Sequence, residues 1–329
     1  MTLRSQRRWR LGIFLACLAL ASATSRIANA QDFPSKPITI VVPFPAGGGT
    51  DVVFRSISPK LQAALGPAAR IVIDNRAGAG GTVGTASAAK AMPDGYTLIA
   101  ATTTTIASAQ AVYPKLGYDP SALVPIGLLG TTPFVLVTAP GFPGRTPAEF
   151  IAHAKAHPGT INYASIGNGS ASHLVAELFK QRAGVEMTHV PYRGAGPAQT
   201  DLMAGQVQVL FDNPTALVQQ VRAGRMQALA ITEPSAVFQD LPTFAAAGMQ
   251  GFRPELWYGL MAPAATPEPV IQRLHAALSR VLEDREVRAD LLARGVAPAA
   301  GTPEAFAQRI RADIALWGGI ARAVGAKVE

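Results

Sequence analysis

The chain has 329 residues, a formal net charge of +8 at pH 7 and a single cysteine, Cys17. Five basic residues and no acidic ones lie in the first thirty positions, so the remaining 299 residues (329 − 30) carry +3 (8 − 5). This part has no cysteine and no Lys/Arg-rich run, which excludes disulfides and thiolate metal sites and argues against a nucleic-acid partner.

The first thirty residues have the pattern of a secretory signal peptide. Basic residues between Arg4 and Arg10 precede a short apolar stretch, Leu11 to Ala21, and a small-x-small cleavage site ends at Ala30. We therefore expect cleavage after Ala30 and a periplasmic mature protein. An uncleaved anchor and a lipidated Cys17 are the alternatives; the apolar stretch is too short for the first.

The next element is predicted to be a strand followed by a glycine-rich turn and a helix. An apolar run (38–42) ends at "PFPAGGGTD" (43–51), after which apolar residues recur every four positions from Val53 to Leu65. Thr50 or Asp51 is the expected helix cap. Turns of this kind hold anions on free backbone N–H groups.

Strand-like and helical segments then alternate along most of the chain, which predicts an α/β fold with largely parallel sheets. The expected strands include 69–74, 95–101 and 134–138, followed by "INYAS", "MTHV", "VQVLF" and "MQALAIT". Expected helices lie near 170–183, 196–204 and 214–223, and another starts at the Thr146 cap and ends at Gly159.

Two amphipathic helices, one after Thr266-Pro267 and one after Thr302-Pro303, have no strand following them. We expect both helices to pack on the first domain, which is formed earlier in the chain. The chain should therefore cross to the second domain once and return once. The crossings are expected at 125–133 and 253–258. The resulting domains are 31–130 with 256–329, and 131–255, preceded by the signal peptide (1–30).

Two further glycine-rich segments, "NRAGAGGTVG" (75–84) and "SIGNGSASH" (165–173), also follow strands. The first approaches a dinucleotide fingerprint, but the next strand lacks the acidic residue that would hold a ribose. Neither contains the Gly-Lys-Ser/Thr of a phosphate loop. We expect no nucleotide and no other cofactor.

Catalytic and metal-binding patterns are weak. "GNGSASH" places Ser170 and Ser172 near His173, but no Gly-x-Ser-x-Gly elbow exists, and His173 is expected to be an ordinary first-turn helix residue. His153 and His157 lie four apart without the Glu of a zinc protease, so no metal site is expected. An exported hydrolase is the minor alternative to a binding protein.

The ordered segments "PFPAGGGTDVVFR", "VIDNRAGAGGTVG", "MPDGYTLIAATT", "SIGNGSASHLVAELFKQRAGV", "HVPYRGAGPAQTDLMAGQVQVLFDN", "AGRMQALAIT" and "LWYGLMAPAATP" resemble the Bug-type receptors. These are the periplasmic solute-binding proteins of tripartite tricarboxylate transporters. The resemblance spans essentially the whole mature chain. It implies a two-lobed, type II-like periplasmic binding protein fold with a double-crossover hinge, and no enzyme activity.

The resemblance also implies a small organic acid ligand, delivery to the membrane permease components of the transporter, and a monomer. Presentation of the ligand to a sensor protein is the alternative. Carried onto this chain, the family's binding loops give the following site residues: Phe44, Ala46, Gly48, Gly49, Thr50, Asp51, Thr103, Ser165, Gly167, Asn168, Gly169, Ser170 and Asp212.

The two facing glycine loops contain no arginine or lysine. We therefore expect backbone N–H groups, the Thr50 and Ser170 hydroxyls and bound water to hold the proximal carboxylate, with Arg76 and Arg193 outside its pocket. Asp51 should orient its own loop, because two like charges in one cleft repel each other.

Overall fold

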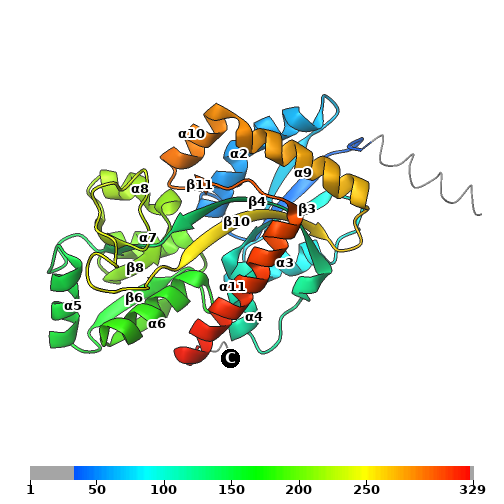
Figure 1. The fold of residues 1–329 in the computed structure, drawn as a ribbon. Helices are drawn as coiled ribbons and strands as arrows, with labels where there is room; N and C mark the ends of the chain where they lie inside the picture. The colour runs from blue at the N-terminus through cyan, green and yellow to red at the C-terminus, as the bar shows by residue number, and fades with distance from the viewer. Residues whose placement is uncertain (1–32, 327–329) are drawn as a thin grey trace, which may run out of the picture.

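The computed structural model describes residues 33–326, which form two lobes, each built around one mixed sheet (Figure 1). The expected signal peptide, its cleavage site and Cys17 lie outside the described residues. Between residues 33 and 326, no helix combines the length and the apolar character needed to cross a membrane.

The first lobe contains a six-stranded sheet in the order β11-β4-β10-β3-β1-β2. Strands β1, β2 and β3 are parallel, and β10 runs antiparallel to both β3 and β4. The strands are β1 (Ile38–Val42), β2 (Ile71–Asn75), β3 (Thr97–Thr102), β4 (Leu123–Pro133), β10 (Glu255–Pro263) and β11 (Ala297–Pro298).

Both faces of this sheet are covered, as its continuous apolar strands predict. Ile40 and Val42 belong to the core cluster that includes helices α2 and α9, while Val41 between them packs in a separate cluster with Phe306 of α11. The helices and helical turns of this lobe are α2 (Gly49–Leu65), η1 (Ala79–Gly81), α3 (Thr82–Ala89), the π-helical η2 (Thr104–Ser108), α4 (Ala109–Val112), η3 (Pro120–Ala122), α9 (Glu268–Glu283), α10 (Arg285–Ala293) and α11 (Pro303–Ala323).

The second lobe contains a five-stranded sheet in the order β7-β6-β8-β5-β9, with β5 antiparallel to both of its neighbours. Its strands are β5 (Val135–Thr138), β6 (Ile161–Ser165), β7 (Met187–Pro191), β8 (Val209–Asp212) and β9 (Gln227–Ile231). Its helices are α5 (Pro147–Ala156), α6 (Ala171–Ala183), α7 (Ala195–Met203) and α8 (Pro214–Arg222).

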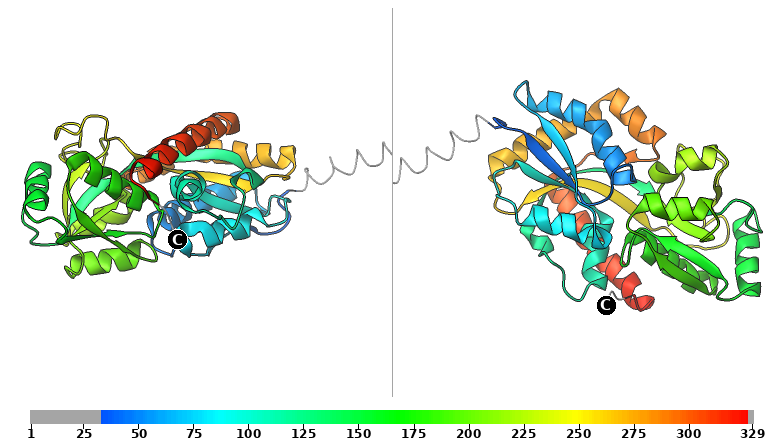
Figure 2. Two further views of the ribbon diagram at one scale, coloured as in Figure 1. Left: turned by 90° about the horizontal axis from the view of Figure 1, so that it is seen from below. Right: turned by 180° about the vertical axis from the view of Figure 1, so that it is seen from behind.

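Two long paired strands connect the lobes. β4 and β10 run antiparallel from the Leu123–Pro263 pair to the Pro133–Glu255 pair, and the second lobe lies beyond this end (Figures 1 and 2). The prediction of largely parallel sheets is wrong for β10, which is antiparallel to both β3 and β4. The chain leaves the first lobe along β4 and returns along β10, so these two strands must run in opposite directions. The proposed boundary at residues 130 and 131 falls inside β4.

The two late helices cover the first lobe, as predicted. α9 packs against α2 and β4, whereas α11 packs against β4 and α4 and reaches α6 of the second lobe with its end. Thr146 caps α5, as expected, and Thr302 caps α11 in the same way, since each side chain accepts a hydrogen bond from the N–H group three residues on. Helix α10 was not predicted; it starts at Asp284, which caps it immediately after α9 ends.

Candidate functional site

Two neighbouring cavities lie between the lobes and share Phe44, Pro45 and Ile166. The inner cavity has a volume of about 30 Å³ and the outer one about 410 Å³. The inner cavity is lined by Phe44, Pro45, Gly48, Gly49, Thr50, Thr102, Thr104, Ile166, Ala195, Asp212, Asn213, Leu256 and Tyr258. The outer cavity is lined by Pro43, Phe44, Pro45, Ala77, Gly78, Ala79, Gly80, Gly81, Tyr113, Ile166, Gly167, Asn168, Pro191, Tyr192, Arg193 and Gly194.

The first-lobe wall of the inner cavity is the start of helix α2. The helix begins at Gly49, and Gly48 occupies the N-cap position without any side-chain cap. The prediction that Thr50 or Asp51 caps this helix is therefore wrong. The backbone N–H groups of residues 49–51 lie in the first turn, so they have no hydrogen-bond partner within the helix. Gly49 and Thr50 line the cavity, and their N–H groups are therefore suited to bind an anion there.

Asp51 holds the glycine loop instead of capping the helix. Its carboxylate accepts a hydrogen bond from Gly47 N–H at 2.9 Å, from Arg55 Nε at 2.8 Å and from Asn75 Nδ2 at 2.9 Å. Asn75 Nδ2 also donates to the Phe44 carbonyl, which ties the end of β2 to the same loop. Burial opposes ionisation of Asp51, but these hydrogen bonds outweigh it and keep its pKa below the ordinary value.

We expect Asp51→Asn to lower the free energy of unfolding by about 1.5–3 kcal/mol at neutral pH, the size of hydrogen bonds to a charged group. The pKa is lowered in the fold, so this stabilisation is complete above the ordinary value of 3.8 and is lost as the pH falls below it. Urea unfolding at neutral and acidic pH measures the difference. Asp74→Asn is the control, because Asp74 pairs with Arg76 at an exposed position and should change stability by less than about 0.5 kcal/mol. Equal losses in the two variants would contradict this role.

The second-lobe loop between β6 and α6 is closed by its own side chains. Ser170 Oγ donates to the Gly167 carbonyl at 2.7 Å and accepts from His173 N–H at 3.3 Å, so it caps α6. Ser170 is buried and lines neither cavity, and the same is true of Ser165. Their placement does not support direct ligand contact; both shape the loop that presents Gly167 and Asn168 to the outer cavity.

Hydrogen bonds join the lobes across the cleft. The Tyr113 hydroxyl of the first lobe lies 2.9 Å from the Asn168 carbonyl of the second, and Ser108 Oγ donates to the Gly169 carbonyl at 3.2 Å. Thr104 Oγ1 accepts from Ala171 N–H, at the start of α6. The structure is therefore a closed form, in which both lobes contribute to both cavities.

The second-lobe wall of the inner cavity is formed by the end of β8. Asp212 Oδ1 accepts hydrogen bonds from the backbone N–H and the side-chain amide of Asn213, both at 2.8 Å. Asp212 Oδ2 and the hydroxyl of Tyr258, on β10, are buried and have no hydrogen-bond partner among the described residues. Burial raises the pKa of Asp212 to about 7, although the bonds from Asn213 act in the opposite direction.

The site residues expected from the sequence divide into two groups. Those that line a cavity are Phe44, Gly48, Gly49, Thr50, Gly167, Asn168 and Asp212. Those that line neither are Ala46, Asp51, Thr103, Ser165, Gly169 and Ser170. Thr103 faces the strands instead, where its hydroxyl accepts from Trp257 N–H, while Thr102 and Thr104 on either side line the inner cavity. Ligand contact by the first group stays a prediction.

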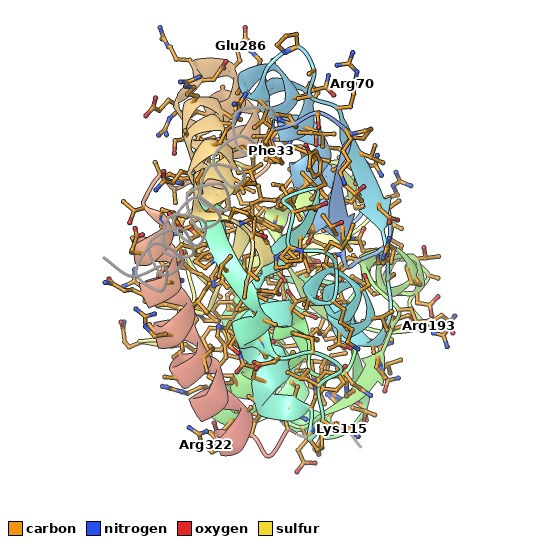
Figure 3. The ribbon with its side chains drawn as sticks, turned by 90° about the vertical axis from the view of Figure 1, so that its right-hand side faces the viewer. Phe33, Arg70, Lys115, Arg193, Glu286 and Arg322 are labelled. Atoms are coloured by element: carbon orange, nitrogen blue, oxygen red, sulfur yellow. The ribbon has the colours of Figure 1, made fainter. Side chains whose placement is uncertain are left out.

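Several lining residues had not been predicted. Asn213 follows a strand and caps the next helix, a signal that the strand-end rule could have caught. The segment 77–81, considered only as a dinucleotide motif, forms a wall of the outer cavity. Arg193 was expected outside the carboxylate pocket; it is absent from the inner cavity but lines the outer one, at the protein surface (Figure 3).

Four of the five histidines form two stacked pairs. His173 lies in the first turn of α6 as expected, and its ring stacks on His189 with centroids 4.0 Å apart. Burial lowers the pKa of His173 and lowers that of His189 to about 3, so both are neutral at pH 7. His153 stacks on His157. Among residues 33–326, no three His, Cys, Asp or Glu side chains gather as a metal site would require.

Two α/β lobes joined by paired strands, with strand-end loops of both lobes around one cleft, define a two-lobed solute-binding protein. The chain belongs to the receptor family of the tripartite tricarboxylate transporters: the model of that family, TctC (tripartite tricarboxylate transporter family receptor), matches residues 53–326. The resemblance noted in the sequence is thereby confirmed.

Individual relatives agree with this assignment. The chain is 36% identical to protein BugT of Bordetella pertussis over 323 residues, which cover 97% of each chain. It is similar to the solved structure of the periplasmic binding protein BugD, with a TM-score of 0.85, 32% identity and coverage of 90% of this chain and 100% of that one. A Rhodopseudomonas palustris structure, MatC with bound malate, gives a TM-score of 0.82 at 36% identity, covering 88% of this chain and 99% of that one.

Proposed function

We propose that this protein is a periplasmic receptor that captures a small organic acid between its lobes and delivers it to the membrane components of a tripartite transporter. One observation carries the ligand class: the start of α2 presents free N–H groups to a small cavity whose lining contains no cationic side chain. Relatives solved with malate and with adipate support the same class. Presentation of the ligand to a sensor protein remains the second candidate role.

The sizes of the two cavities suggest how the acid is oriented. About 30 Å³ accommodates one carboxylate or a water molecule or two, whereas about 410 Å³ accommodates the rest of a small ligand. The proximal carboxylate would then lie in the inner cavity beside Gly49 and Thr50. The remainder of the ligand would extend past Phe44 into the outer cavity.

A thermal-shift screen of organic acids tests the proposal. An acid present at about a hundred times its dissociation constant should stabilise the protein by about 2.7 kcal/mol. Mass spectrometry should recover the acid chemically unchanged, which separates a receptor from a hydrolase. If only sugars, nucleotides or metal ions stabilise the protein, the proposed function is wrong.

Arg193 is the one cationic side chain that lines the outer cavity, so we expect it to interact with the distal end of the ligand. The side chain is exposed, so its attraction for a second carboxylate should be modest. We expect Arg193→Gln to weaken binding of a diacid by about 2- to 5-fold and to leave its monoacid analogue unaffected. Calorimetric titration with adipate and hexanoate makes the comparison, with Arg76→Gln as the control outside both cavities. Loss of all binding in Arg193→Gln would instead mean that an arginine clamps the ligand.

A further inference from the structure

Asp212 is a buried carboxyl group with one oxygen unused. Its side chain lies at the end of β8, and the residue is 2% exposed. Oδ1 accepts both hydrogen bonds from Asn213, and Oδ2 has no partner among the described residues. Asp212 lines the inner cavity, so a group that occupies that cavity lies beside this carboxyl.

Among the residues that the structure describes, no cationic side chain lines the inner cavity to compensate a charge on this carboxyl. The residues that line the inner cavity include only one other titratable group, Tyr258, and burial raises the pKa of its hydroxyl as well. An ionised carboxylate without a counter-charge is expensive in such a place. Asp212 therefore favours its neutral form, in which Oδ2 becomes a hydrogen-bond donor.

The elements around β8 do not supply a charge either. Strand β5 carries no titratable side chain, and β6 carries only Tyr163, whose hydroxyl donates to Glu177. The charged residues on the neighbouring elements are either paired elsewhere or exposed. On α6, Glu177 pairs with Lys180 and Arg182 is exposed; on α7, Asp201 accepts from Tyr192; on α8, Arg222 is exposed. On α2, Asp51 pairs with Arg55 and Lys60 with Asp284, and on β10 Glu255 pairs with Arg309. His173 on α6 is neutral and stacks on His189.

We propose that Asp212 binds the ligand in its protonated form, donating a hydrogen bond from Oδ2 to the ligand carboxylate, so that binding above neutral pH is coupled to the uptake of one proton. This inference rests on the proposed function, since it requires a carboxylate in the inner cavity. Two carboxyl groups side by side in a buried cavity share a proton, because ionising both is costly. The Tyr258 hydroxyl, which also has no hydrogen-bond partner within the described part of the chain, donates to the same anion.

The direction of the pH dependence follows from this arrangement. In the free protein the pKa of Asp212 is about 7, and a bound anion beside it raises the pKa further. Above pH 7 the free protein must gain a proton to bind, so the association constant falls about tenfold for each pH unit. Between the ligand's own pKa values and pH 7, Asp212 is already protonated in the free protein, so the affinity is nearly constant.

Calorimetric titration tests the proposal with malate as the probe, or with adipate where malate does not bind. Titrations between about pH 6 and 9, in buffers of different ionisation enthalpy, report the protons taken up. We expect uptake to approach one proton per ligand above pH 7. Asp212→Asn keeps a donor of the same size at every pH, so its affinity should be independent of pH. Asp74→Asn, outside both cavities, should keep the pH dependence of the unchanged protein.

The contrary outcomes separate the inference from the proposed function. Binding without proton uptake, or a pH dependence that survives in Asp212→Asn, would overturn the inference alone. Affinity that rises with pH would also overturn it, because binding would then favour the ionised form of Asp212. If no organic acid binds the unchanged protein at any pH, the proposed function fails as well.

Discussion

Replacing Gly49 by Ala is expected to reduce ligand affinity by about a hundredfold while leaving the fold intact. A Cβ atom at this position would lie 2.7 Å from Asn213 Oδ1 and 3.0 Å from the Tyr258 hydroxyl in the closed form. Asn213 cannot easily move away, because its side chain donates to Asp212 and caps α8. Overpacking of this kind costs about 1–3 kcal/mol, or about 5- to 150-fold in affinity, and the methyl group would also occupy the small inner cavity.

The free protein should tolerate the same change. Gly49 begins α2 and is not among the glycines with positive φ, so alanine fits its backbone. Asn213 belongs to the other lobe, so opening the cleft removes the closest contact. Calorimetric titration and urea unfolding together separate the two effects. Gly196→Ala is a matched control, since nothing lies within 4 Å of its added Cβ on α7. Unchanged affinity in Gly49→Ala would show that the ligand does not use the inner cavity.

The architecture could be predicted from the sequence because it depends on local patterns. Strand runs such as 38–42, the Thr146 and Thr302 caps, and the two late amphipathic helices each carry a short-range signal. The orientation of a strand in its sheet has no such signal. The antiparallel placement of β10 depends on the chain returning from the second lobe, a long-range relation that "LWYGLMAP" does not encode by itself.

The site was predictable at the level of loops but not of side chains. Glycine turns after strands indicated the first-lobe loop, and Gly48, Gly49 and Thr50 do line the inner cavity. The polarity of Ser170 could not decide whether its hydroxyl faces a ligand or its own backbone. In the structure the hydroxyl accepts a hydrogen bond from His173 N–H and caps α6. Tyr258 gave no signal, because every residue of β10 after Glu255 is buried and no alternation marks the cleft side.

Trp257, next to Tyr258 on β10, should control stability and not binding, because successive strand residues point to opposite faces. Its ring packs edge-on against Phe306 of α11 with centroids 5.0 Å apart, and its Nε1–H donates to Asp313 Oδ2 at 2.7 Å. We therefore expect Trp257→Ala to lower the free energy of unfolding by about 3–5 kcal/mol, through the cavity it leaves and the hydrogen bond that Asp313 loses. Tyr258→Phe is the matched control: its hydroxyl has no hydrogen-bond partner among residues 33–326, so unfolding in urea should change little while ligand affinity falls. If Trp257→Ala weakened binding by the folded protein and left stability unchanged, the indole would belong to the cleft and not to the core beneath α11.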